Sequence, residues 1–364
     1  MKTVRRLLYG DILASVVFVA FAFLSLFFFI DFVDELSAAV APGYSALSAA
    51  AYGLLLVPGH LYELLPIAVL IGAIYALSRM AQSSEFTILR TGGLGPARAL
   101  RLLTFLGLGF GVLTFLVGDY AAPWAEAQAA HWQAESRGNF NLGRSGAWLK
   151  DHSVTPQGER NYAINVGGVG AAGALRNVRI FEFDTDGRLL RRVAAEQATV
   201  EKNAPWALMK VKLTQWDAQN VKQTELAQMP WPSNLDAKVV AAAVLPLTTM
   251  STLDLARYIS HLADNEQAAQ QYQIQFWKRA LYPLACLVMV ALALPFAYLQ
   301  TRAGSISLKV FGGIMLGISF VLLNNVAGHL GLLRDWTPWI VASAPSALYL
   351  LLSLGAFAWL VRFR

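Results

Sequence analysis

Six long apolar stretches constrain this chain more than any other feature of its 364 residues. The hydrocarbon core of a bilayer is about 30 Å thick, so a helix needs roughly 20 apolar residues to cross it. Three stretches precede a long polar segment and three follow it, which predicts three membrane helices on either side of an insert. The stretches cover residues 12–30, 54–77 (broken by Pro58 and Pro66), 102–118, 280–299, 310–330 and 339–361.

The composition of the chain also indicates a membrane protein. Hydrophobic residues make up 56% of the chain and charged residues 14%, whereas a soluble domain has roughly 45–50% and about 25%. These values argue against a disordered chain and against an ordinary cytosolic enzyme. Residues 121–273 hold 15 of the 29 basic and 15 of the 23 acidic residues, so the net charge of +6 belongs to the apolar, basic-edged ends.

The basic residues also predict an orientation. Eleven Lys and Arg residues lie at the termini and in the loops on one side of the predicted spans, and Arg334 alone lies in the short loops on the other side. Because cytoplasmic loops carry the excess of Lys and Arg, we expect both termini in the cytoplasm and the insert outside. The first stretch has 19 residues, longer than the apolar region of a signal peptide (about 7–15), which favours an uncleaved span.

The insert has the pattern of β-structure. Val178, Ile180 and Phe183 alternate with polar residues, and residues 184–187 (DTDG) form a turn signal. Strands about 10 residues apart predict a sandwich or jelly roll, which could be a plain solvated domain or a binding module with a groove or an open edge. From Ser251 the period becomes helical, with Asp254 placed to complete a capping box.

A short helix is predicted in the loop between the second and third spans, at residues 83–92. Ser83 or Ser84 can cap it, Glu85 and Arg90 suit its two ends, and a Gly-Gly pair terminates it. A helix of two turns is marginal alone, so it needs packing partners, with Phe86 as one anchor. It could lie on its own membrane domain or dock into a cytoplasmic partner, and these residues leave both readings open.

Several motifs along the chain resemble those of the LptF/LptG family of bacterial lipopolysaccharide export permeases, and the LptG branch more than the LptF branch. No single motif is decisive, but their order and spacing are specific, and the match covers the whole chain. The motifs are DFVDEL at 31–36, SEFTILRTGG at 84–93, AP at 122–123, GAWLKD at 146–151 and YQIQFW at 272–277.

The resemblance implies an α-helical membrane protein with six transmembrane helices (3+3) and an inserted periplasmic β-jelly-roll domain. It divides the chain into residues 1–122 with a coupling helix at 83–92, a periplasmic domain at 123–250, and residues 251–364. It further implies the Gram-negative inner membrane and transport of lipopolysaccharide toward the outer membrane. The implied partners are an LptF-like permease, an LptB-like ATPase dimer, an LptC-like single-span protein and the periplasmic bridge protein LptA.

The same resemblance assigns roles to particular residues. The coupling set toward the ATPase is Ser84, Glu85, Phe86 and Arg90, with Glu85 at the position that pairs with an arginine of the ATPase. The expected substrate-cavity residues come from the chain itself and not from the resemblance. Asp31 and Glu63 are ionisable groups near span ends, which could also simply lie at the wet interface. Phe28 and Phe32 could form an apolar wall for acyl chains, and Arg137, Lys278 and Arg279 could supply positive charge.

One departure from the family concerns lysines that meet lipid phosphates in many relatives. The matching positions here are Asp31, Ser37, Ala38 and Gly59. Because a carboxylate repels phosphate, we expect the positive charge to come from the partner permease or from basic residues elsewhere, such as Arg137, Arg144, Lys278 and Arg279. A substrate with fewer phosphates, or with bridging divalent ions, is the other alternative.

Signatures of other functions are missing from the sequence. It has no GxxxxGK[ST] phosphate loop, no HExxH motif and only one cysteine, so we expect no catalytic, cofactor or metal site in this chain and ATP hydrolysis by a partner. The spaced glycines Gly107, Gly109 and Gly111 indicate close helix packing. A stand-alone secondary transporter is the main rival, although nearly charge-free spans count against it. An LptF-type subunit is the other alternative.

Overall fold

The computed structural model describes residues 2–38, 45–136, 140–141, 146–155, 158–169, 174–200, 205–216, 220–232, 240, 249–264, 269–298 and 306–362. The chain forms two compact units. The helical unit comprises Met1–Val33, Leu56–Pro123 and Gln273–Arg364, and the second unit, mainly β-sheet, comprises Asp34–Leu55 and Trp124–Tyr272.

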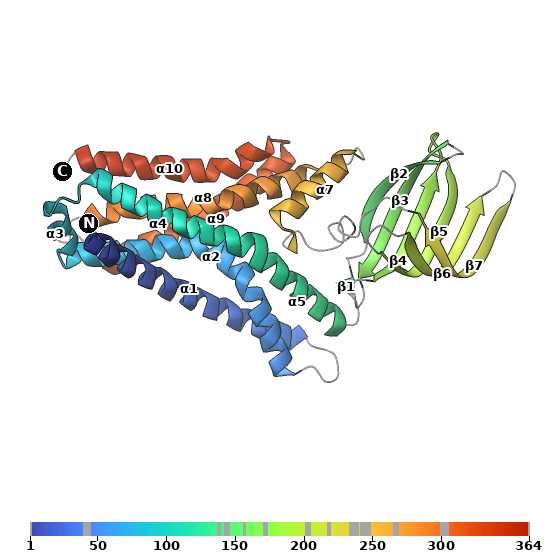
Figure 1. Cartoon of the computed structure of the whole chain (residues 1–364), viewed down its shortest axis with the longest axis horizontal. Helices are drawn as coiled ribbons and strands as arrows, with labels where there is room; N and C mark the ends of the chain where they lie inside the picture. Colours follow the sequence, from blue (N-terminus) through green and yellow to red (C-terminus); the bar gives the residue numbers. More distant parts are fainter. Residues whose placement is uncertain are drawn as a thin grey trace. The chain divides into compact units, whose positions relative to one another are not determined.

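Among the described residues, six helices are long and apolar enough to cross a membrane, which confirms the predicted arrangement of three spans, an insert and three spans (Figure 1). The third continues from α4 through a π-helical turn, η1, into α5. The elements of the six spans are α1 (Lys2–Ala38), α2 (Ala46–Gln82), α4 (Pro96–Leu116) with η1 (Val117–Ala121) and α5 (Ala122–Ser136), α8 (Gln270–Tyr298), α9 (Ile306–Leu333) and α10 (Pro338–Arg362).

The two prolines of the second span do not interrupt it, contrary to the expectation from sequence. α2 runs for 37 residues and contains both Pro58 and Pro66. Membrane helices tolerate proline because neighbouring helices and local adjustments of the backbone satisfy the carbonyl groups that proline leaves without a donor. The prolines are therefore part of one continuous helix.

Glycines allow the helices of this unit to approach closely. A Cβ on Gly72 of α2 would lie 2.7 Å from the Cα of Val16 in α1, and one on Gly107 of α4 would lie 3.1 Å from the Cα of Leu287 in α8. A Cβ on Gly111 would lie 3.0 Å from the carbonyl oxygen of Pro283 in α8, whereas a Cβ on Gly109 would meet no atom within 4 Å. Close packing is thus confirmed for two of the three spaced glycines.

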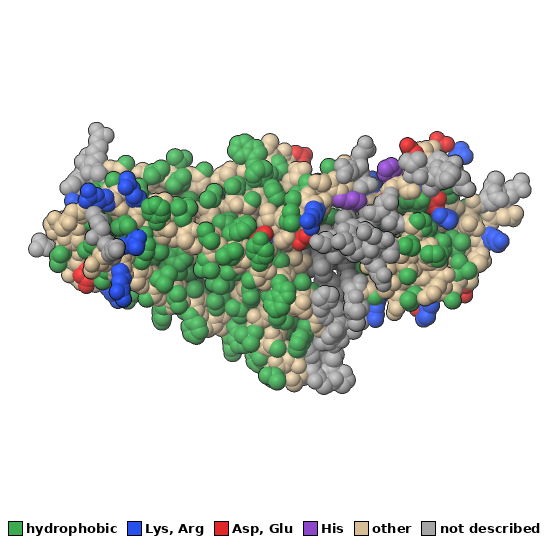
Figure 2. Space-filling model, in the orientation of Figure 1, with side chains coloured by type: hydrophobic (Ala, Val, Ile, Leu, Met, Phe, Trp, Pro, Cys, Tyr) green, Lys and Arg blue, Asp and Glu red, His purple; other side chains and the backbone are tan. Residues whose placement is uncertain are grey.

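Charge and hydrophobicity are separated along the helical unit. On the face seen in Figure 2, hydrophobic side chains cover its middle, and Lys and Arg side chains gather at the end where Figure 1 shows both termini and α3 (Glu85–Thr91). An apolar belt with basic residues at one end is the distribution of a membrane-spanning helical bundle.

The insert contains one antiparallel sheet, which confirms an inserted β domain. The strands pair in chain order from β3 to β7, and β1 and β2 pair with successive stretches of the free edge of β3. The described strands therefore form a single sheet and not two separate ones. They are β1 (Phe140–Asn141), β2 (Ala147–Thr155), β3 (Gly158–Val169), β4 (Leu175–Phe183), β5 (Leu189–Thr199), β6 (Trp206–Trp216) and β7 (Val221–Trp231).

This sheet curls until distant strands touch. The rings of Tyr162 in β3 and Trp231 in β7 lie 5.5 Å apart, although three strands separate β3 from β7 in the sheet order. Strands hydrogen-bond at a spacing of about 4.8 Å, so a flat sheet would hold these two strands about 19 Å apart. Apolar residues of the long strands consequently meet in one core, which includes Ile164, Val193 and Trp206. β7 contributes Trp231 to this core, whereas most of its other side chains are exposed.

Two local signals in this part of the chain form as predicted. Between β4 and β5, Asp184 accepts hydrogen bonds from the amides of Asp186 and Arg188, and Gly187 has a φ of 78°. At the start of α7 (Thr252–Asp264), the amide of Asp254 donates to the hydroxyl of Ser251, whose own proton goes to the Asp254 carboxylate. Both structures depend on contacts within four residues, which is why the sequence reveals them.

Candidate functional site

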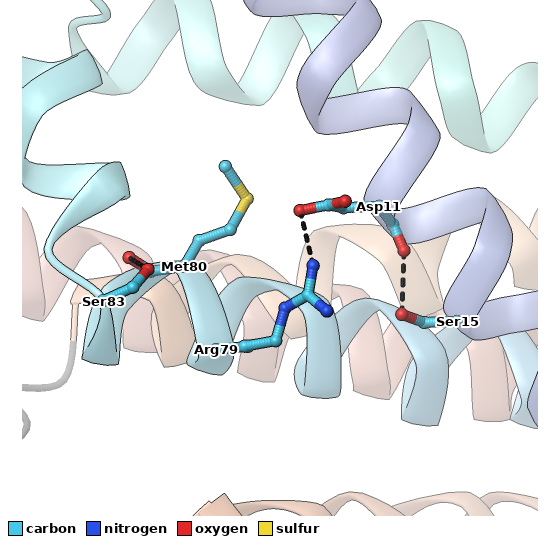
Figure 3. Close-up of polar contacts among 5 residues, drawn as sticks. All are labelled: Asp11, Ser15, Arg79, Met80 and Ser83. Atoms are coloured by element: carbon cyan, nitrogen blue, oxygen red, sulfur yellow. Dashed lines mark hydrogen bonds and ion pairs between the residues drawn. The ribbon is translucent and has the colours of Figure 1, made fainter.

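The short helix α3 follows α2 after a turn of two residues, Ser83 and Ser84. Ser84 has a φ of 62°, in the left-handed region, and its side chain makes no capping hydrogen bond. The hydroxyl of Ser83 instead points back and donates to the carbonyl of Met80 (3.3 Å, Figure 3). The expectation that a serine side chain caps α3 was therefore wrong: the tight turn needs a left-handed residue at this position.

The end of α3 matches its expected termination. The amide of Leu94 donates to the carbonyl of Leu89 (3.0 Å), and the amide of Gly93 donates to the carbonyl of Arg90 (3.1 Å). This pair of bonds is a Schellman motif, which needs a left-handed residue at the position of Gly93, and Gly93 has a φ of 100°. The two residues that make the hydrophobic contact in such a motif, Leu89 and Leu94, both pack in the core of the helical unit.

One side of α3 is anchored on the helical unit. Phe86 is 3% exposed, and its ring meets the ring of Tyr298, the last residue of α8, edge to face at 5.2 Å. The guanidinium of Arg90 lies 5.5 Å from the centre of the same ring, and Phe357 of α10 packs on Tyr298 as well. Phe86 therefore fixes α3 to the ends of α8 and α10. This contact is the one expected if the short helix lies on its own membrane domain.

The other side of α3 is open. Ser84, Glu85 and Thr87 are exposed, and Ile88 keeps 67% of its surface accessible. Within the described part of the chain, no basic side chain forms an ion pair with Glu85. A carboxylate beside an exposed isoleucine on an anchored helix is a surface that a basic, partly apolar partner could bind.

The helix that leads into α3 is joined to α1 near this end. Arg79 of α2 donates to the carboxylate of Asp11 in α1 at 2.9 Å (Figure 3). Farther along the two helices, the imidazole of His60 lies 2.7 Å from the carboxylate of Asp31. Two polar contacts and the close approach at Gly72 therefore hold α1 against α2 at three levels.

A pocket of about 560 Å³ opens in the helical unit, away from α3. α1, α2, α8, α9 and α10 contribute to its wall, and three of the expected cavity residues line it: Glu63, Lys278 and Arg279. Its remaining lining includes apolar side chains such as Ile67 and Leu322 and the amides Asn324 and Asn325. The pocket thus combines an apolar wall with a few charged and polar groups, as ligand pockets do.

Arg279 is the most enclosed of these three residues. It is 7% exposed, donates to the carbonyl of Gly118 in η1 (3.1 Å), and lies over the ring of Tyr62. A Cβ on Gly118 would lie 2.3 Å from that ring, so the glycine makes room for Tyr62. Tyr282 packs against Tyr62 from α8 and donates to the carbonyl of Glu63 (2.6 Å). This aromatic cluster holds Arg279 and the backbone of Glu63 in place.

Lys278 is the more open cation. It is half-buried, and its ammonium donates to the carbonyl of Asn324 in α9 at 3.0 Å. The side chain lies across Gly328, where a Cβ would come within 2.3 Å of Nζ. Among the described residues, neither the Lys278 ammonium nor the Glu63 carboxylate forms an ion pair. The pocket therefore holds a cation and an anion that do not pair with each other.

The other expected cavity residues lie elsewhere or outside the described structure. Asp31 contacts His60, and the rings of Phe28 and Phe32 stack with their centres 6.4 Å apart. None of these three residues lines the pocket. Arg137 lies outside the described residues, as does Arg144.

Sequence reasoning missed several lining residues, of which Phe27, Tyr62 and Tyr282 are the largest. The only available signal was the position of Tyr62 beside Glu63, the one acidic residue within the second apolar stretch. Nothing in the sequence singled out Phe27 from the neighbouring phenylalanines.

Comparison with known proteins decides the family. The family model for the lipopolysaccharide export system permeases LptF/LptG matches residues 6–362. The chain belongs to this family. Members of the LptF/LptG family are permeases, and with its six apolar helices the chain is a multi-pass protein of the inner membrane.

Two curated relatives show the branch. LptG of Escherichia coli (strain K12) is 29% identical over 349 residues, 94% of each chain, and LptG of Haemophilus influenzae (strain ATCC 51907 / DSM 11121 / KW20 / Rd) is 24% identical over 355 residues, 97% of each. Both carry the name "lipopolysaccharide export system permease protein LptG". The resemblance to LptF/LptG permeases, and to LptG in particular, is confirmed.

Proposed function

We propose that this chain is the LptG-type subunit of a lipopolysaccharide exporter of the ABC type, and that a partner ATPase drives it through α3. The observation that carries the proposal is the two-sided character of α3. Phe86 and Leu94 anchor it to the helical unit, while Glu85 and Ile88 face outward.

The orientation follows from the basic residues. Lys and Arg gather at the end of the helical unit that carries α3 (Figure 2), so this end faces the cytoplasm together with both termini. The chain passes from the third span into the β unit, and from the β unit into the fourth span, at the ends of these spans that lie away from α3. The β unit then faces the periplasm. α3 is in this way exposed to the compartment that contains ATP.

The proposed assembly comprises this chain, an LptF-like permease, an LptB-like ATPase dimer and an LptC-like single-span protein, with LptA as the periplasmic bridge. ATP binds to the ATPase and not to this chain. Closure of the ATPase dimer displaces α3, the motion passes into the spans, and lipopolysaccharide leaves the inner membrane for the bridge. Membership of the LptG branch and the exposed face of α3 support this assembly.

Affinity purification from native membranes in mild detergent tests the proposal. We expect the tagged chain to recover an ATPase, a second six-span permease and a single-span β-domain protein. Glu85→Ala should lose the ATPase and keep the permease, because truncating one partner of a charge pair that is buried in an interface weakens binding by about 2–5 kcal/mol.

Glu159→Ala is the matched control, since Glu159 is an exposed glutamate of β3 on the other side of the membrane. It should keep every partner. Recovery of the chain alone, or full retention of the ATPase by Glu85→Ala, would contradict the proposed coupling through α3.

A further inference from the structure

The pocket of the helical unit lies near one end of the spans. Asn324, which accepts the Lys278 hydrogen bond, is nine residues before the end of α9, and a helix rises 1.5 Å per residue, so it lies about 14 Å from that end. In the proposed orientation this is the periplasmic end. The polar part of the pocket therefore lies in the half of the bilayer that the outer leaflet occupies, below the headgroup layer.

Two opposite charges line this pocket without neutralising each other. The Lys278 ammonium has one carbonyl partner, which leaves two of its three N–H donors for a ligand. The Glu63 carboxylate is exposed, and only its backbone carbonyl, not its side chain, receives the hydrogen bond of Tyr282. Arg279 cannot serve as a second open cation because its guanidinium is buried between Gly118 and Tyr62.

A ligand bearing only negative charge does not suit this arrangement. A phosphate that binds Lys278 would bring its charge into the same pocket as Glu63, and like charges repel strongly in surroundings of low dielectric. A ligand that carries both a phosphate and an ammonium group satisfies both side chains. The apolar wall, with Ile67, Leu281 and Leu322, suits the acyl carbons next to such a headgroup.

We propose that this pocket binds a zwitterionic lipid headgroup in which a phosphate carries a primary amine. Lys278 binds the phosphate, and Glu63 accepts hydrogen bonds from the ammonium group. Two lipids share this chemistry: phosphatidylethanolamine, as a resident lipid of the membrane, and a glycolipid whose phosphate is substituted with phosphoethanolamine. The proposal rests on the membrane orientation given under the proposed function, and it does not depend on the ATPase.

Direct binding to the purified full-length chain in detergent tests it. The probes are dihexanoyl phosphatidylethanolamine, phosphatidylglycerol and phosphatidylcholine, with binding measured by native mass spectrometry or by the shift in melting temperature. We expect phosphatidylethanolamine to bind about tenfold more tightly than phosphatidylglycerol, the scale of one charge-assisted hydrogen bond. Phosphatidylcholine should also bind less tightly, because its quaternary ammonium has no N–H donor.

Variants separate the two contacts. Glu63→Gln should lower the affinity for phosphatidylethanolamine to that for phosphatidylglycerol, and Lys278→Met should weaken both by about tenfold or more, whereas Lys278→Arg should retain binding. The controls Glu196→Gln and Lys222→Met change exposed residues of the β unit and should bind like the native chain. Equal affinity of the native chain for the two phospholipids, or a preference that survives Glu63→Gln, would overturn the proposal.

A second set of probes identifies the source of the headgroup. Lipid A with and without a phosphoethanolamine substituent is compared on the native chain and on Glu63→Gln. A preference for the substituted form that Glu63→Gln abolishes identifies the exported glycolipid as the ligand. Discrimination among phospholipids alone identifies a resident membrane lipid. Because neither result involves ATPase recovery, failure of this proposal is distinguishable from failure of the coupling proposal.

Discussion

Replacing Phe86 by alanine should release α3 from the helical unit. Phe86 is 3% exposed and contacts Tyr298, and truncating a buried phenylalanine costs about 3–5 kcal/mol. α3 has only seven residues, and a helix of that length is marginal without tertiary contacts. The loss therefore exceeds what α3 can compensate, and the helix should open locally while the spans stay folded.

Hydrogen exchange of the full-length chain measures this opening directly. The reporters are the amides of Gly92 and Leu94, which donate to the carbonyls of Ile88 and Leu89 within the terminating turn. A local destabilisation of about 3 kcal/mol accelerates exchange about 100-fold when exchange is limited by the opening equilibrium. We expect at least that change for the peptide covering residues 84–95 and little change in the rest of α2.

Ile88→Ala is the matched control on the same helix. Ile88 is 67% exposed, and exposed substitutions usually stay within about 0.5 kcal/mol, so exchange should change by no more than about threefold. The reasoning is refuted if Phe86→Ala accelerates exchange less than fivefold, or if Ile88→Ala has the larger effect.

Three further predictions concern packing and protonation. Gly118→Ala should lower the melting temperature by the equivalent of about 1–3 kcal/mol, because the new Cβ would overlap the Tyr62 ring. The control Gly109→Ala, which has open space around the new Cβ, should leave the melting temperature unchanged. Equal effects of the two changes would refute the close packing of Gly118 on Tyr62. Trp231→Ala should destabilise the β unit by about 3–5 kcal/mol in urea, and Trp148→Ala, which is 54% exposed, by less than about 1.5 kcal/mol. Burial raises the pKa of the Tyr258 phenol above its usual 10.0, so its contribution to stability is complete below pH 10 and lost as the pH rises toward the raised pKa; Tyr258→Phe should lose less stability than the native chain between pH 9 and 11 in thermal melts.

Features that depend on neighbouring residues could be predicted from the sequence. The Schellman turn at Gly93, the capping box at Ser251 and the turn at Gly187 each depend on side chains and amides at most five residues apart. The six spans are similarly predictable, because hydropathy over about 20 residues decides whether a helix can enter the bilayer. The family resemblance came from the order and spacing of short motifs, of which the arrangement of the spans around an insert was only one part.

Features that depend on distant partners could not be predicted. Phe27 rather than Phe28 lines the pocket, because the choice depends on which side of α1 faces α2. Asp31, expected near the substrate, contacts His60, 29 residues away. The same limit applies to Ser84, whose backbone is left-handed (φ 62°) although a residue with a side chain rarely adopts that region.

The turn at Ser84 has a mechanical consequence. Only two residues connect α2 to α3, and one of them is confined to the left-handed region, so the junction has no slack. A load applied to α3 therefore becomes a torque on α2, and the Asp11–Arg79 contact and the close approach of Gly72 to Val16 carry part of that torque into α1. A displacement of α3 should therefore rotate α2 along its whole length, from the cytoplasmic end to the periplasmic end.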